Sequence, residues 1–244
     1  MSIVVIGGHT RSVGKTSVVA GLIAAFRELR WTALKITQYG HGICSANGKS
    51  CDCATGDHSW AVTEERNRSG ESDTSRFLIA GAEHSWWVRT EQGRLAEAMP
   101  RVRAIVAAAE NVIIESNSIL RFLKPDLYLT VLDPATEDFK SSAQQFLDRA
   151  DAVLLHAEKI GSRVSALGSG KTGSRLSALA SRKSELSAKG NGNGEDPGKS
   201  SQTSPVWKQV SLKPVSNRPT FALRPPEYVT PEIVAFVRSR IGSS

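Results

Sequence analysis

Short apolar runs alternate with segments of helical periodicity along most of the chain. The apolar runs predict strands at residues 2–7, 32–37, 84–89, 111–115, 126–132, 151–155 and 219–223. The spacing of apolar residues predicts helices at 15–29, 73–81, 91–109 and 230–241, and another near 140–149. Between residues 38 and 72 the chain is polar, and no regular element is expected there. This alternation predicts an α/β fold, in which a mostly parallel sheet carries helices on both faces.

One segment differs from the rest of the chain in both composition and charge. The formal net charge of the 244 residues is +7, and residues 157–218 hold the whole excess, with 11 Lys or Arg against 4 Asp or Glu. Between residues 161 and 205, 19 of 45 residues are Gly or Ser, which leaves too little apolar material for a core. We therefore expect one domain over 1–244 with a disordered insertion at about 160–205. Because the rest of the chain is neutral, no nucleic-acid partner is indicated.

The apolar runs are too short for a membrane protein. None approaches the roughly 18 to 20 residues that a transmembrane helix needs. Residues 3–6 are apolar, but they lead into Gly7 and Gly8 rather than into a cleavage site, which argues against a signal peptide. The sequence thus predicts a cytoplasmic protein with no membrane partner.

A glycine-rich loop joins the first expected strand to the first expected helix. Residues 8–16 read GHTRSVGKT, which is the position and composition of a phosphate-binding loop. Backbone N–H groups and the helix N-terminus would cradle the phosphates, Lys15 would reach their oxygens, and the Thr16 hydroxyl would bind Mg²⁺. The residues assigned to nucleotide binding are Gly8, Thr10, Arg11, Ser12, Val13, Gly14, Lys15, Thr16 and Ser17. A second Gly-Lys-Thr at 170–172 has no strand directly before it, so we expect no site there.

Two further charged residues fall on expected strands. Glu115 ends the run VIIE, and the carboxyl ends of parallel strands face the crevice where α/β sheets bind ligands. It could organise Mg²⁺ there, or it could be a surface glutamate at a strand end. Lys35 lies inside TALKIT. It could contact a phosphate or a substrate anion, it could be an edge-strand lysine, or it could be a lysine on a covered strand whose ammonium extends to solvent.

These motifs resemble two groups of P-loop NTPases. The loop spacing, the lysine on the second strand and the strand-end glutamate are similar to those of dethiobiotin synthetases. The element DTSRFLIAGA, residues 73–82, resembles the MobB family of molybdopterin-guanine dinucleotide biosynthesis proteins. The resemblance covers roughly residues 2–156, and it implies a P-loop NTPase fold, bound Mg²⁺, and GTP or ATP. It also implies that Asp73 lies near the Mg²⁺, beside Thr16 and Glu115.

All three cysteines lie close together between two histidines. Cys44, Cys51 and Cys53 follow His41 and precede His58, within a Gly-rich polar loop at 38–58. Clustered cysteines in a cytosolic chain indicate metal or redox chemistry before structural disulfides. Three thiolates with His41 or His58 suit Zn²⁺, and three thiolates suit an Fe–S cluster. Redox thiols and ordinary loop cysteines remain alternatives.

Several functions are compatible with these patterns. The first is a MobB-like accessory protein of molybdopterin cofactor biosynthesis that binds and hydrolyses a nucleotide. The others are an ATP-dependent enzyme like dethiobiotin synthetase, a metallochaperone NTPase, and a binding module without turnover. In the catalytic readings the active residues are Lys15, Lys35, Asp73 and Glu115. The partners expected are the nucleotide, a protein of cofactor biosynthesis and a second copy of the chain. No Asn-Lys-x-Asp guanine signature follows residue 155, so ATP and GTP both remain open.

Overall fold

The computed structural model describes residues 1–39, 59–136, 138–156 and 215–241. Its strands are β1 (Ile3–Gly8), β2 (Trp31–Tyr39), β3 (Trp60–Glu64), β4 (His84–Glu91), β5 (Asn111–Glu115), β6 (Leu127–Leu132), β7 (Ala152–His156) and β8 (Thr220–Leu223). Its helices are α1 (Lys15–Ala25), α2 (Asp73–Ala80), α3 (Leu95–Ala108), α4 (Ser141–Gln145) and α6 (Pro231–Ile241). Short 3-10 turns are formed at Arg27–Leu29, Ser118–Arg121 and Leu147–Arg149. These elements alternate along the chain as the sequence predicts.

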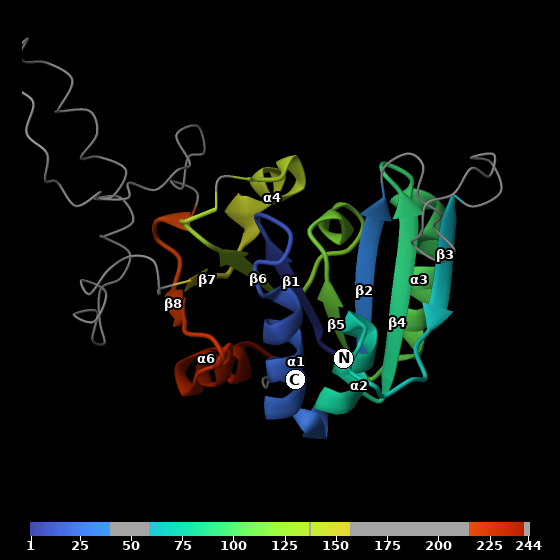
Figure 1. The fold of residues 1–244 in the computed structure, drawn as a ribbon, viewed down its shortest axis with the longest axis horizontal. Helices are drawn as coiled ribbons and strands as arrows, with labels where there is room; N and C mark the ends of the chain where they lie inside the picture. Colours follow the sequence, from blue (N-terminus) through green and yellow to red (C-terminus); the bar gives the residue numbers. More distant parts are fainter. Residues whose placement is uncertain (40–58, 137, 157–214, 242–244) are drawn as a thin grey trace, which may run out of the picture.

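The described strands form one eight-stranded sheet in the order β3-β4-β2-β5-β1-β6-β7-β8 (Figure 1). All neighbouring strands are parallel except β3 and β4, which run antiparallel. The central strand β1 lies between β5 and β6, and every residue of β6 is buried. Strands that are covered on both faces in this way need a nearly continuous apolar sequence. This explains why these strands could be predicted from the sequence. The carboxyl ends of β1, β2 and β5 therefore meet at one edge of the sheet.

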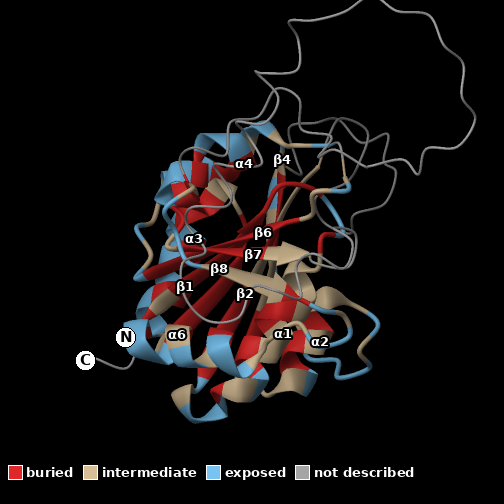
Figure 2. Ribbon diagram, turned by 90° about the vertical axis from the view of Figure 1, so that its left-hand side faces the viewer, coloured by how far each residue is buried: buried red, intermediate tan, exposed pale blue. Residues whose placement is uncertain are grey.

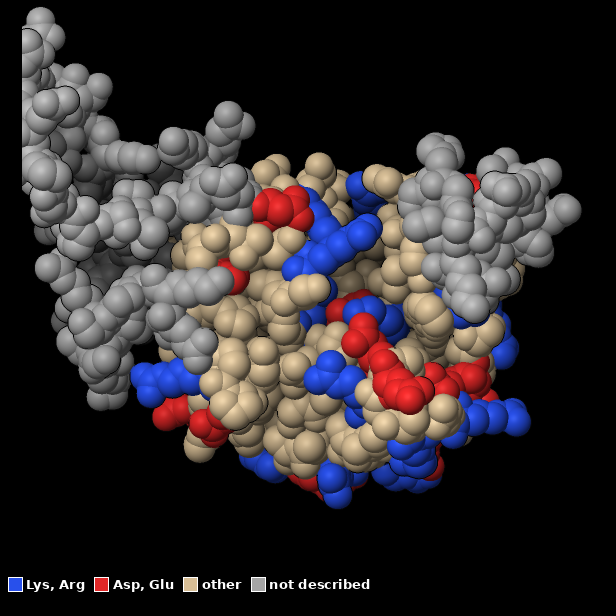
Figure 3. Space-filling model, viewed as in Figure 1, with Lys and Arg blue, Asp and Glu red and all other residues tan. Residues whose placement is uncertain are grey.

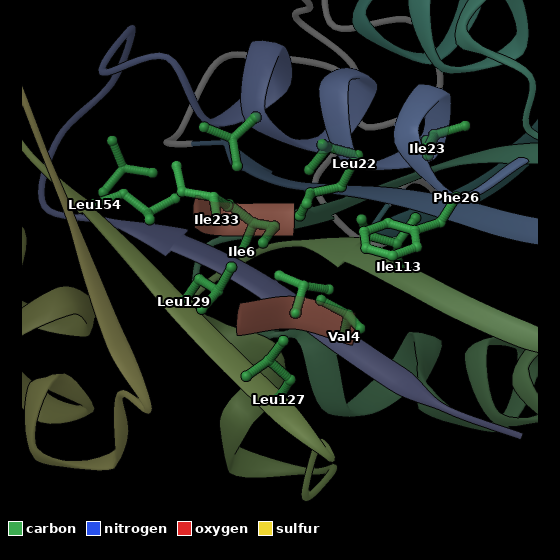
Figure 4. Close-up of a cluster of buried hydrophobic side chains, with 14 of the residues drawn as sticks. Val4, Ile6, Leu22, Ile23, Phe26, Ile113, Leu127, Leu129, Leu154 and Ile233 are labelled. Atoms are coloured by element: carbon green, nitrogen blue, oxygen red, sulfur yellow. The ribbon is translucent and has the colours of Figure 1, made fainter. Parts of the chain in front are cut away.

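Helices cover both faces of the sheet. Figure 2 shows α1, α2 and α6 on one side of it and α3 and α4 on the other. Alternate residues of β1 point to opposite faces: Val4 and Ile6 pack with α1 and α6, whereas Val5 packs with α3. Figure 4 shows the first of these cores, where Phe26 lies against Ile113 of β5 and Leu22 lies on the same side of the sheet. Each such side chain contributes roughly 1.5–3 kcal/mol by leaving water.

Helix α2 has strong signals at both ends. The Ser72 side chain accepts a hydrogen bond from the Ser75 backbone N–H, and the Ser75 side chain accepts one from the Ser72 N–H. Gly81 ends the helix with a φ of 115°, a left-handed conformation that suits glycine. These caps fix the position of Asp73, the first residue of the helix.

The structure corrects several expected boundaries. The helix expected at 15–29 ends at Ala25, because Phe26 leaves helical geometry with a φ of −130°. The helix expected at 91–109 begins only at Leu95, after a turn in which Gly93 has a φ of 89°. The helix expected near 140–149 is a short α4 followed by a separate 3-10 turn.

One strand lies where no element was expected. Strand β3 falls within the polar stretch from 38 to 72, and β2 continues to Tyr39, so the loop expected from residue 38 begins later. In the sheet β3 pairs only with β4, and none of its five residues is fully buried. A half-exposed edge strand does not need the continuous apolar run that marks a central one, which is why its sequence gave no signal.

Several sequence expectations fall outside the described residues. They include most of the loop at 38–58, the insertion at about 160–205 and the second Gly-Lys-Thr at 170–172. Within the parts of the chain that the structure describes, no helix is both long and apolar enough to cross a bilayer.

Candidate functional site

The loop after β1 has the backbone that phosphate binding requires. Ser12 and Gly14 both adopt positive φ, 54° and 90° respectively, and α1 begins immediately afterwards at Lys15. Left-handed residues within a loop turn successive N–H groups toward one side, and the start of α1 adds N–H groups without helical partners. A side chain at Gly14 would also be excluded by space, since its Cβ would lie 2.5 Å from Tyr228 Cε1. The loop therefore offers an anion-binding concavity at the carboxyl end of β1.

Asn117 holds the first glycine of this loop from the neighbouring strand end. The Gly8 N–H donates to Asn117 Oδ1 at 2.9 Å, and Asn117 Nδ2 donates to the Gly8 carbonyl at 2.8 Å. A Cβ at Gly7 would lie 2.3 Å from the same Oδ1, so glycine is needed for this approach. Asn117 follows β5 directly, and its role in the loop was missed by sequence reasoning. Its position just beyond a buried strand was the only signal for it.

The other end of the loop is held by residues from late in the chain. His156, the last residue of β7, donates from Nε2 to the Val13 carbonyl at 2.9 Å. The His156 ring meets the Tyr228 ring edge-on, with centroids 6.1 Å apart. Val13 itself is buried in the core beneath α1. These contacts, together with those of Asn117, hold the loop at both ends.

Lys15 lies folded back on the loop that it follows. Its Nζ donates to the Thr10 carbonyl at 2.6 Å, and in the described residues no carboxylate forms an ion pair with it. Burial lowers the pKa of Lys15 from 10.5 to about 8, against an opposing effect of the Glu115 charge. The nearby ammonium groups of Lys140 and Lys35 lower it further. A buried ammonium without a counter-ion is poised to accept an anion.

Two carboxylates, one hydroxyl and one ammonium meet beside Lys15. The Thr16 hydroxyl donates to Glu115 Oε2 at 2.8 Å, and Lys35 pairs with Glu115 and, at 2.8 Å, with Asp73 Oδ2. Lys35 Nζ also lies 3.5 Å from Thr16 Oγ1. Burial alone would lower the pKa of Lys35, but the two carboxylates outweigh it and raise that pKa. Four residues named by sequence reasoning thus come together from α1, β2, α2 and β5.

Burial and position argue against a surface role for Glu115 and against an edge-strand position for Lys35. The Glu115 side chain is 3% exposed, so it is not a surface glutamate. Lys35 is 18% exposed and lies on β2, between β4 and β5, so it is not an edge-strand lysine. A buried carboxylate and a buried ammonium each need a partner, and here they provide it for one another.

The oxygens around Lys35 suit a magnesium ion. Mg²⁺ in nucleotide sites is held by one or two carboxylates or hydroxyls together with water and phosphate oxygens. Thr16, Asp73 and Glu115 provide that donor set, and Asp73 is 41% exposed, which leaves its side open. In the structure the Lys35 ammonium lies among these three oxygens. These three oxygens therefore already surround a positively charged group.

The remaining predicted residues occupy the rim of the loop. Arg11 and Ser12 are exposed. The Ser17 hydroxyl accepts a hydrogen bond from Arg76 Nη2 at 3.1 Å, and Arg76 Nη1 lies 3.9 Å from Asp73 Oδ1. Ser17, in the first turn of α1, thus helps to join α1 to α2 through Arg76.

The segment after β6 was not identified from the sequence, yet it reaches the same loop. The Thr10 hydroxyl donates to Asp138 Oδ2 at 2.6 Å, and the Lys140 backbone N–H donates to the His9 carbonyl at 2.8 Å. Phe139 packs on the His9 ring with centroids 5.3 Å apart. In Figure 3, basic and acidic side chains gather around a hollow in the middle of this face.

The cysteine cluster cannot be placed in this site. Its residues, Cys44, Cys51, Cys53, His41 and His58, all lie outside the described residues. Within the described ranges, no three His, Cys, Asp or Glu side chains form a group that could hold a metal ion.

The comparisons with known proteins yield matches only at the level of the backbone. No protein-family model matches the chain, and no curated protein sequence matches it. Similar solved structures include LpxK from Aquifex aeolicus in complex with ATP, at 17% identity over 66% of this chain and 50% of that chain, with a TM-score of 0.40. They also include HypB from Helicobacter pylori in complex with nickel, at 13% identity over 97% of this chain and 83% of that chain, with a TM-score of 0.39.

The fold is therefore identified from the strand order and the loop of this chain itself. The chain spans half the length of the LpxK chain that it matches. Similarity at this level concerns the fold and carries no information about activity. A mostly parallel sheet whose central strand leads through GHTRSVGKT into a helix has the arrangement of the P-loop NTPase fold.

Proposed function

We propose that this protein binds a nucleoside triphosphate with Mg²⁺ and transfers or hydrolyses its terminal phosphate. The observation that carries the proposal is the convergence of Lys15, Thr16 and Glu115 at the carboxyl end of β1, where Thr16 donates to Glu115 at 2.8 Å. The preformed loop supplies the N–H groups that phosphate oxygens need. Lysine, hydroxyl and carboxylate in this relation are the set that phosphoryl transfer uses.

Each residue has a distinct part in this proposal. Lys15 would exchange the Thr10 carbonyl for phosphate oxygens, and this exchange is favourable because one bond to a neutral acceptor is replaced by bonds to anionic oxygens. Thr16, Asp73 and Glu115 would hold the metal, which when bound neutralises charge on the transferred phosphate. Lys35 would move from those oxygens toward the phosphate or an anionic acceptor.

We propose two more specific functions for the same site. The MobB-like element DTSRFLIAGA supports an accessory role in molybdopterin cofactor biosynthesis, with a protein of that process or a second copy of the chain as partner. The Lys35–Glu115 pair supports the alternative of a dethiobiotin-synthetase-like enzyme, in which Lys35 steadies the anionic substrate. Both readings use the same site. The MobB-like reading leaves ATP and GTP open, whereas the dethiobiotin-synthetase-like reading uses ATP.

The test of the function is a nucleotide titration carried out over a range of pH. Micromolar or tighter binding of ATP or GTP with Mg²⁺ is expected near neutral pH, since most Lys15 is then protonated. Because the pKa of Lys15 is about 8, the ammonium is lost as pH rises above that value, and affinity for the anion is lost with it. Affinity should fall by up to about tenfold between about pH 7 and about pH 9. The pKa of Lys140 is also lowered, by burial first and then by Arg11, so it acts in the same direction.

The Lys15→Arg variant is the control for this pH dependence. Its guanidinium stays charged throughout the range, so most of the decrease should disappear whatever the variant's absolute affinity. If wild-type protein bound neither nucleotide at any pH, the proposed function would be wrong.

A second candidate function is a metallochaperone in which nucleotide state controls metal transfer. It is favoured by the sequence pattern H-x2-C-x6-C-x-C-x4-H from His41 to His58, a set of ligands suited to Zn²⁺ or to an Fe–S cluster. Metal analysis of the purified protein should find about one zinc, or an iron chromophore, per chain. The Cys51→Ser/Cys53→Ser variant should lose that metal and still bind nucleotide. Three freely titrating thiols with no metal would contradict this candidate.

A further inference from the structure

Lys140 is a third lysine at the site, placed there by a part of the chain that carries no nucleotide motif. It follows β6 and precedes α4, and its backbone is fixed at both ends. Its N–H donates to the His9 carbonyl at 2.8 Å, and its own carbonyl accepts from the Ala143 N–H at 2.9 Å. Two residues earlier, Asp138 accepts from the Thr10 hydroxyl at 2.6 Å. The position of Lys140 beside the loop is therefore determined by the loop itself.

The hydrogen bonds of Lys140 with His9 and of Asp138 with Thr10 place this segment at the start of the loop, and the charges that act on Lys140 belong to the same site. Its ammonium interacts electrostatically with Arg11, Asp138, Lys35 and Glu115, and it also acts on Lys15. Lys35 and Glu115 lie on the side of the loop where the metal-binding oxygens gather. In the proposed function these oxygens would hold the metal close to the terminal phosphate, so that phosphate would lie on the same side of the loop.

The described carboxylates near Lys140 have other partners, which leaves its ammonium available to an added anion. Among the described residues, Asp73 and Glu115 both pair with Lys35, and Asp138 accepts from Thr10. No described carboxylate forms an ion pair with Lys140, whose side chain is half-buried. Burial lowers its pKa, and the Arg11 charge adds to that effect. A partly desolvated ammonium without a partner gains more from a phosphate than an exposed lysine does.

We propose that Lys140 contacts the terminal phosphate of the bound nucleotide and thereby makes the site prefer the triphosphate to the diphosphate. The inference rests on the proposed nucleotide binding and adds to it a residue that senses the terminal phosphate. Lys15 and the loop N–H groups contact the phosphates of a diphosphate and a triphosphate alike, whereas Lys140 contacts only the terminal phosphate of the triphosphate. Loss of that phosphate would leave Lys140 without its counter-ion and weaken the hold on the product.

The experiment compares two ligands rather than one. Wild-type protein and Lys140→Met are titrated with the β,γ-imido analogues of ATP and GTP and, separately, with ADP and GDP, all with Mg²⁺. In the variant, affinity for the triphosphate analogue should fall by about tenfold, while affinity for the diphosphate should change less than about twofold. Lys140→Arg should recover most of the preference, because it restores the charge.

Matched variants separate this effect from a structural one. Lys124→Met removes an exposed lysine before β6, at the opposite end of that strand, and should change neither affinity. Lys140→Gln removes the charge but keeps a polar side chain. The backbone N–H at position 140 still donates to the His9 carbonyl in every variant, because this hydrogen bond does not involve the side chain. An equal loss for both ligands would mean that Lys140 acts only through the general positive potential. Unchanged affinity for both would show that it makes no contact, and either result overturns the proposal. Failure of wild-type protein to bind any nucleotide would instead overturn the proposed function.

Discussion

Replacing Lys15 with alanine is expected to reduce nucleotide affinity by about a hundredfold or more, because the variant loses its charge-assisted bonds to phosphate. The fold should be unaffected. The ammonium of Lys15 makes one hydrogen bond, to the Thr10 carbonyl, and its pKa of about 8 shows that burial already disfavours its charge. Equilibrium binding of a fluorescent nucleotide, with melting temperature measured alongside, checks both statements.

The second Gly-Lys-Thr in the chain supplies the control. Lys171→Ala changes the same residue type in the same tripeptide and should leave nucleotide binding at the wild-type level. A comparable loss in that variant would mean that the wrong motif was chosen. Wild-type affinity in Lys15→Ala would remove the phosphate-loop assignment altogether.

Glu115→Gln is expected to abolish the effect of Mg²⁺ on nucleotide binding. The substitution keeps the size of the side chain and an oxygen that can accept from Thr16, but it removes one of two carboxylate charges from the metal site. Affinity measured with Mg²⁺ should then approach the value measured with a chelator, and any hydrolysis should slow by about a hundredfold or more. Lys35 keeps Asp73 as a partner at 2.8 Å, so the variant should still fold.

Glu110→Gln is the matched control for this variant. Glu110 is also paired with a cation, Arg30, but its side chain is 56% exposed and lies away from the loop. An exposed pair of this kind contributes little to stability, so neither folding nor Mg²⁺ dependence should change. If Glu115→Gln kept its full response to Mg²⁺, the carboxylate would have no role at the metal.

The predictable part of the site consists of residues whose local sequence carries the signal. Lys15 and Thr16 lie in a contiguous motif between an apolar strand and a helix. Glu115 ends a buried run, and Lys35 interrupts one, so both are conspicuous against an apolar background. Asp73 was indicated only by a resemblance, since nothing in its own neighbourhood says that α2 begins beside α1.

The unpredicted residues reach the site through the order of the strands. Asn117 touches Gly8 because β5 neighbours β1, and Lys140 touches His9 because β6 lies on the other side of β1. Periodicity shows that these strands exist but not which ones are adjacent. Tyr228 is less predictable still, because its contact with Gly14 requires the position of the segment before α6.

The contacts of the phosphate loop with His156 and Tyr228 have a consequence for the order of folding. His156 follows Val13 by 143 residues, and Tyr228 comes still later in the chain. During synthesis the loop therefore emerges well before the two groups that hold its later part. Contacts of such large sequence separation form late and slowly, because a long loop must close before they contribute. Nucleotide should therefore be bound only by chains synthesised past Tyr228, and a shorter nascent chain would expose its glycine-rich segment without yet having a binding site.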